Sequence, residues 1–157
     1  MTNDKCTATQ QQNEQNKHIM TFPLNHGLHK TGLPLIVVKI FDHDICLMLD
    51  TGSNCNIIDH RIYDHFKDRL KYSETSSEVY TLNGAARGIE IDVPFCFENF
   101  DYHEPFLCTE MTDAFDKIYE ESGIQIHGIL GNHFFLKHGW ILDFEKIEVY
   151  KQYRKKT

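Results

Sequence analysis

The stretch 35–59, which reads LIVVKIFDHDICLMLDTGSNCNIID, constrains the fold of this chain more than any other. Its two apolar runs, Leu35 to Ile40 and Ile45 to Leu49, flank a polar turn and predict a hairpin of two strands. The second run leads directly into Asp50, and a glycine turn and a further apolar run, 56–58, follow. Because burying a carboxylate is costly unless other groups compensate it, an aspartate at the end of a buried strand indicates a chemical role.

Asp50-Thr51-Gly52-Ser53 is a weak motif when taken alone, since Asp often begins a turn between two strands. It gains weight from the apolar residues on both sides and from a second element, Ile129-Leu130-Gly131, far downstream. Between the two lies a predicted hairpin around Asn83-Gly84, because both residues tolerate positive φ. The three elements together favour a catalytic aspartate over an ordinary turn.

In kind and in order, these elements resemble those of the retropepsin-like aspartic proteases, from about Leu33 to Tyr150. The resemblance implies a mostly β, single-lobe acid-protease barrel with one flap hairpin and two or three short helices, paired as a twofold homodimer. It implies an aspartic endopeptidase that hydrolyses a peptide or protein substrate without a metal or other cofactor. Ser53 departs from the alanine usual in retroviral members and is more similar to pepsin-type lobes.

The resemblance also assigns roles to individual residues. Asp50 is the catalytic carboxylate and pairs with Asp50 of a second chain, while Thr51 reaches across the twofold axis. Gly52 lets the two backbones approach closely, and Ser53 is expected to donate a hydrogen bond to the Asp50 carboxylate. Ile129, Leu130 and Gly131 support the turn from beneath. The flap over the substrate is expected at Tyr80, Thr81, Leu82, Asn83, Gly84 and Ala85.

Several alternatives stay open at this point. The same fold could serve a dimeric peptide-binding or scaffold module with little or no turnover, in which Asp50 is a polar docking centre. A monomeric β-domain with an incidental Asp-Thr-Gly is a third reading, and the flap could be a plain surface hairpin. Cys55 has no predicted base beside it, so core or interface packing is favoured over a thiol nucleophile.

Periodicity and turn signals divide the rest of the chain into short elements, which indicates a mostly β fold. The domain is expected at 21–151, between a disordered Gln/Asn-rich tail, 1–20, and a basic tail, 152–157. Helices are predicted at 60–66 with Asp59 as the cap, at 113–121, and at 132–138 before Gly139. Further strands are predicted at 77–82, 88–93, 95–100, 105–111 and 126–130, and two within 140–150.

Composition narrows the possible partners and surroundings. A net charge of -7 argues against a nucleic-acid partner, which would require clustered Lys and Arg. No apolar run reaches the roughly 18 residues that cross a membrane, and no secretory signal is visible, although a removed signal would leave no trace. Five cysteines without a disulfide or CxxC pattern favour a reducing, cytoplasmic location. The histidine spacing, including His60 with His65, matches no metal motif, so no metal site is predicted.

Overall fold

The structure, a computed structural model, describes residues 18–81 and 84–152. The predicted tails, apart from residues 18–20 and 152, and the predicted flap-tip residues Leu82 and Asn83 lie outside these ranges. The first strand begins at His18, before the predicted domain start at residue 21, and the last strand ends at Gln152. Among the described residues, no helix combines the length and the apolar character needed to cross a bilayer.

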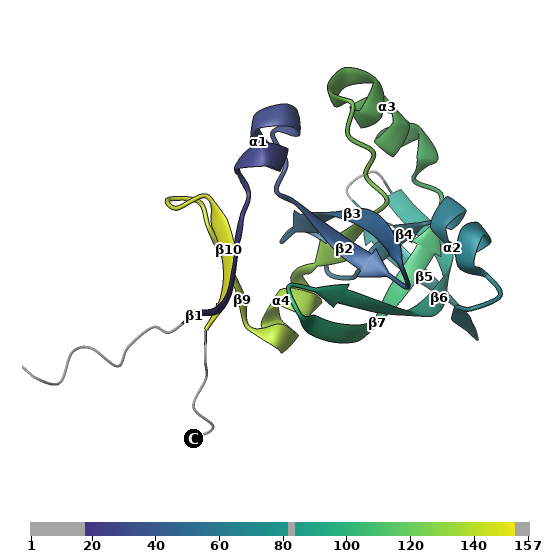
Figure 1. The fold of residues 1–157 in the computed structure, drawn as a ribbon. Helices are drawn as coiled ribbons and strands as arrows, with labels where there is room; N and C mark the ends of the chain where they lie inside the picture. The colour runs from purple at the N-terminus through teal and green to yellow at the C-terminus, as the bar shows by residue number, and fades with distance from the viewer. Residues whose placement is uncertain (1–17, 82–83, 153–157) are drawn as a thin grey trace, which may run out of the picture.

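A closed six-stranded barrel forms the body of the molecule (Figure 1). Hydrogen bonds join its strands in the order β2-β3-β8-β4-β7-β6, and the pairing of Lys39 in β2 with Cys96 in β6 closes the ring. β5 extends the sheet along the outer part of β6. The strand bounds are β2 Leu35–Ile40, β3 His43–Asp50, β4 Ile57–Asp59, β5 Lys71–Thr81, β6 Gly84–Phe97, β7 Phe100–Thr109 and β8 Gly128–Gly131.

A second, three-stranded antiparallel sheet lies beside the barrel (Figure 1). Its order is β1-β10-β9, with β1 at His18–Pro23, β9 at Trp140–Asp143 and β10 at Glu148–Gln152. The two ends of the described chain therefore lie together, because β1 pairs along the length of β10. Among the described strands, β1 and β9 each pair only with β10, so both edges of this sheet are open.

The four helices of the described chain are short and have recognisable ends. They are α1 Asn25–Thr31, α2 His60–Phe66, α3 Thr112–Ser122 and α4 Asn132–His138. Asp59 caps α2, since its side chain accepts a hydrogen bond from the main-chain N–H of Arg61. Gly139 ends α4 in the left-handed conformation, with φ 67. The predicted helices 60–66 and 132–138 are confirmed, and the predicted helix 113–121 lies within α3; α1 was not predicted.

The predicted strand at 95–100 is wrong. Glu98 and Asn99 have positive φ values of 48 and 67, and the chain reverses there into β7. Phe97 pairs with Phe100, so the turn holds only the two residues between them. Asn tolerates this conformation better than most side chains, and apolar residues on both sides hide the reversal from a pattern search.

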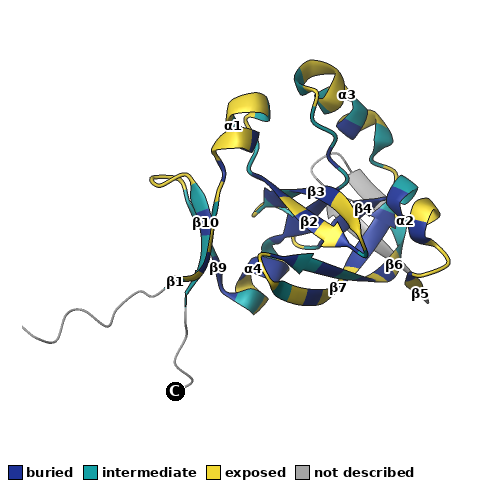
Figure 2. Ribbon diagram, in the orientation of Figure 1, coloured by how far each residue is buried: buried dark blue, intermediate teal, exposed yellow. Residues whose placement is uncertain are grey.

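Alternation along β3 separates two apolar layers, and Figure 2 shows the buried residues concentrated on the barrel strands. Ile45, Leu47 and Leu49 belong to the main core of the barrel. Cys46 and Met48 point to the opposite face and pack in a second cluster with Phe115 of α3. Because side chains on a strand alternate with a period of two, Asp50 shares the face of Cys46 and Met48.

Candidate active site

Asp50 lies where two distant segments of the chain meet. It is the last residue of β3, and β3 runs parallel to β8 with Asp50 opposite Gly131. β4, which follows the glycine turn, pairs with the other side of β8. The structure thus brings Asp50 and the Ile129-Leu130-Gly131 element together, as their sequence pattern predicted.

The Asp50 turn is fixed by main-chain hydrogen bonds. The N–H of Gly52 donates to Asp50 Oδ1 at 2.8 Å, and the N–H of Ser53 donates to the Asp50 carbonyl oxygen at 3.2 Å. Asp50 is half-buried, whereas Thr51 and Gly52 are exposed. The carboxylate is therefore held in one orientation at a point that a second molecule can reach.

The prediction that Ser53 donates to the Asp50 carboxylate is wrong. Ser53 Oγ donates instead to the carbonyl oxygen of Cys55, at 2.7 Å. A hydroxyl has one proton to donate, so in this arrangement Ser53 tightens the turn rather than holding the carboxylate. Burial raises the pKa of the Cys55 thiol, which disfavours Cys55 as a nucleophile.

Gly131 is required by its neighbours rather than by its backbone angles. A Cβ at this position would lie 2.2 Å from the carbonyl oxygen of Cys55 and 2.9 Å from that of Ser53. The next residue, Asn132, donates its N–H to the same Ser53 oxygen at 2.7 Å. The strand carrying Gly131 therefore packs directly against the turn that follows Asp50.

Asn56 completes this packing and was not among the predicted site residues. Its side chain is buried, its Oδ1 accepts from the N–H of Gly131 at 2.9 Å, and its Nδ2 donates to the carbonyl oxygen of Pro105 at 3.1 Å. The sequence signal was a polar side chain within the short run Cys55-Asn56-Ile57-Ile58, whose other members are apolar. A buried amide in such a run needs partners, and here it links β8 to β7.

Four of the predicted flap residues, Tyr80, Thr81, Gly84 and Ala85, lie on the hairpin of β5 and β6. Tyr80 pairs with Ala85, and Thr81 pairs with Gly84, so two residues form the connection. Those two residues, Leu82 and Asn83, lie outside the described chain. The hairpin is confirmed, and its role as a flap stays a prediction.

An apolar hollow of about 520 Å³ lies beside the exposed side of the Asp50 turn. Thr51 contributes to its wall, and the other lining residues come from α4, β9 and the segment after β9. Two of these, Leu136 and Phe144, are 68% and 64% exposed. The lining residues are Thr51, Asn132, Phe135, Leu136, Trp140, Ile141, Leu142 and Phe144.

Comparison by sequence gives no relative: no family model and no curated protein matches the chain. Comparison of structures finds similar proteins. EIAV protease in complex with the inhibitor HBY-793 is 17% identical, with a TM-score of 0.53 over 68% of this chain and 88% of its own. The retroviral protease-like domain of Ddi1 from Leishmania major is 11% identical, with a TM-score of 0.55 over 78% and 94%. A retropepsin-like aspartic protease from Rickettsia conorii is 15% identical, with a TM-score of 0.52 over 83% and 96%.

These three neighbours span a virus, a protozoan and a bacterium, and each is covered over most of its length. At identities of 11–17%, the similarity establishes the fold of this chain but not its activity. The barrel, the parallel pairing of β3 with β8 and the hairpin of β5 and β6 are therefore the elements of one known architecture. This chain has the retropepsin-like fold of the aspartic proteases.

Proposed function

We propose that this protein is an aspartic endopeptidase whose catalytic pair is Asp50 and the Asp50 of a second copy of the chain. The observation that carries the proposal is the position of Asp50 at the meeting point of β3, β8 and β4, with its carboxylate oriented by Gly52. An aspartate that only began a turn would not need Gly131 and Asn56 packed behind it.

The chemistry needs two carboxylates. Two aspartates a few ångströms apart cannot both ionise cheaply, so the pair shares one proton, as is well known for aspartic proteases. One carboxylate then takes a proton from the attacking water, and the other donates its proton to the carbonyl oxygen of the peptide. The pair titrates as a unit, so no separate pKa belongs to either Asp50.

The exposed surface around Thr51 supports the homodimer. Thr51 borders the apolar hollow, and Leu136 and Phe144 leave large apolar side chains exposed in the same wall. Such a surface beside an incomplete site suits a second copy of the chain, because an apolar face loses its contact with water when two copies pair. A twofold axis through this surface brings the two Asp50 turns together.

The decisive activity experiment compares the wild type with Asp50→Asn on an unfolded protein substrate, such as casein, from pH 3 to pH 8. We expect cleavage by the wild type and a loss of at least a hundredfold in Asp50→Asn. Asp68→Asn is the matched control, since Asp68 is exposed and lies beyond the end of α2. Near-ultraviolet circular dichroism of each variant verifies that the fold is retained.

The outcomes separate the proposal from its rival. Equal cleavage by the wild type and Asp50→Asn would refute the catalytic role of Asp50. Saturable peptide binding by the wild type without cleavage would support the alternative, a dimeric peptide-binding or scaffold module of the same fold. In sedimentation experiments, Leu136→Glu should weaken the dimer while Val37→Glu, at another exposed apolar position, should not.

A further inference from the structure

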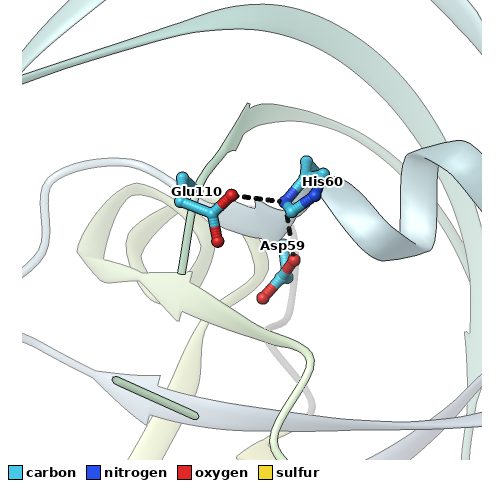
Figure 3. A group of neighbouring side chains, drawn as sticks. All are labelled: Asp59, His60 and Glu110. Atoms are coloured by element: carbon cyan, nitrogen blue, oxygen red, sulfur yellow. Dashed lines mark ion pairs between the residues drawn. The ribbon is translucent and has the colours of Figure 1, made fainter. Parts of the chain in front are cut away.

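At the end of β4, three side chains of types that can bind metals lie together where strands lead into helices (Figure 3). Asp59 ends β4 and His60 begins α2, while Glu110 follows β7, just before α3. His60 Nδ1 is 3.1 Å from Asp59 Oδ1 and 3.1 Å from Glu110 Oε2. One ligand atom from each residue lies within 4.8 Å of the other two.

The Nδ1 atom of His60 is the unusual member of this group. The His60 side chain is 40% exposed, but its Nδ1 atom is shielded from solvent, and neither of the two nearby oxygens makes a hydrogen bond with it. A buried polar atom without a hydrogen bond is rare and requires an explanation. An imidazole nitrogen 3.1 Å from each of two carboxylate oxygens, without a hydrogen bond to either, is placed as it would be around a cation.

We propose that Asp59, His60 and Glu110 bind one Zn²⁺ ion. Zinc is held by imidazole nitrogen and carboxylate oxygen at about 2.0–2.2 Å, in tetrahedral geometry, so neighbouring ligand atoms are about 3.3 Å apart. The two distances of 3.1 Å at Nδ1 are close to this value. Glu110 is 64% exposed, and its Oε1 accepts a hydrogen bond from the main-chain N–H of Thr112 at 3.0 Å, which leaves Oε2 as the ligand atom. Water completes the fourth position.

The charges of the group favour a divalent cation. The guanidinium of Arg61 forms ion pairs with two nearby carboxylates. One is that of Asp59, at 3.3 Å, and the other is that of Asp116, at 2.9 Å. With Glu110, three carboxylates thus face one guanidinium, and two negative charges remain for the metal. The Asp59 side chain is 1% exposed, and its carboxylate is oriented by the N–H of Arg61, as the partners of metal ligands commonly are.

The position of the group indicates a structural role. Ile58 of β4 is opposite Gly128, at the other end of β8 from the Gly131 that is opposite Asp50. Two ligands precede or begin α2, and the third precedes α3, whose Phe115 covers the second apolar cluster. Zinc bound here would tie the starts of two helices together and would not take part in chemistry at Asp50.

The test is equilibrium dialysis of the full, chelator-treated chain against ZnCl₂, with metal content measured per chain. We expect one tight site in the wild type and at least tenfold weaker binding in His60→Ala and in Glu110→Gln. His65→Ala on the same helix and Glu120→Gln on α3 are the matched controls, and both should bind like the wild type. ZnCl₂ should also raise the unfolding temperature of the wild type and of Asp50→Asn, but not that of Glu110→Gln.

Two results would overturn the proposal. One is zinc binding by the wild type that is no tighter than binding by His60→Ala. The other is a loss of binding in His65→Ala as large as the loss in His60→Ala, which would assign the metal to other histidines. Neither result depends on protease activity, so failure of the zinc site and failure of the proposed function remain distinguishable. Glu110 is exposed and Gln has the same shape, so a folding defect would not obscure the answer.

Discussion

Replacing Asn56 with alanine tests whether the Asp50 turn is held from behind by one buried amide. Asn56→Ala removes the acceptor of the Gly131 N–H, 2.9 Å away, and the donor to the Pro105 carbonyl oxygen, 3.1 Å away. The Gly131 N–H lies in a buried strand and would be left without a partner. Pro105 is exposed, so its carbonyl oxygen can turn to water instead.

The magnitude follows from this difference between the two partners. An unsatisfied buried group costs about 1–3 kcal/mol, and loss of an ordinary hydrogen bond costs about 0.5–1.5 kcal/mol. The free energy of unfolding should therefore fall by about 2–4 kcal/mol, which leaves most small domains folded. If Asp50 is catalytic, the folded variant should also lose activity, because the strand opposite Asp50 is no longer fixed.

The assay is urea unfolding followed by fluorescence of Trp140, which is the only tryptophan of the sequence and is 5% exposed. Every variant is measured at one protein concentration, since dimerisation would contribute to the apparent stability. Asn54→Ala is the control: the residue is exposed and two positions away, so a change within about 0.5 kcal/mol is expected. Equal effects of the two substitutions would refute the argument that Asn56 holds the turn.

Two further predictions concern buried ionisable groups. Burial raises the pKa of the Cys46 and Cys108 thiols from 9.0 to about 11, so the unfolded chain loses these protons first as pH rises. The free energy of unfolding should fall between pH 9 and 11, by about 2–3 kcal/mol for each thiol, and less steeply in Cys108→Ala; an unchanged slope in that variant would contradict the assignment. Glu104 has a 6% exposed carboxylate that contacts Lys137 at 2.9 Å and His138 at 2.6 Å. Replacing both partners with alanine should cost about 3–5 kcal/mol, and much less in a Glu104→Gln background; equal costs in the two backgrounds would show that the charge is irrelevant.

Local rules predicted the parts of this fold whose signals are local. The α2 and α4 helices have the predicted bounds because Asp59 caps one and Gly139 ends the other. The hairpin of β2 and β3 was predicted from two apolar runs, although the connection holds only Phe41 and Asp42. These signals lie within a few residues of the elements they define, so no tertiary contact is needed to interpret them.

The parts that were missed depend on contacts between distant residues. β1 is held by β10, which is more than a hundred residues away, and α1 follows it without a side-chain cap. The sequence marks Asn56 only as a polar residue between Cys55 and Ile57, and its role follows from its contacts with Gly131 and Pro105. The Asp59, His60 and Glu110 group combines two neighbours in the sequence with a distant residue that follows β7, so no spacing rule for metal sites could find it.

The contacts around Asp50 hold the turn firmly but leave one oxygen of its carboxylate without a hydrogen bond from the described residues. The main chain fixes the turn through Gly52, Ser53 and Gly131. Within the described part of the chain, the hydrogen bond to the carboxylate is the one that Gly52 donates to Oδ1. Oδ2 is thus an acceptor on an exposed turn, held by the orientation of the carboxylate and without a hydrogen-bond donor among the described residues. A partner that supplies a proton to this oxygen, such as the carboxyl of a second Asp50, gives the arrangement its physical reason. The proposed catalysis by Asp50 would therefore depend on dimerisation.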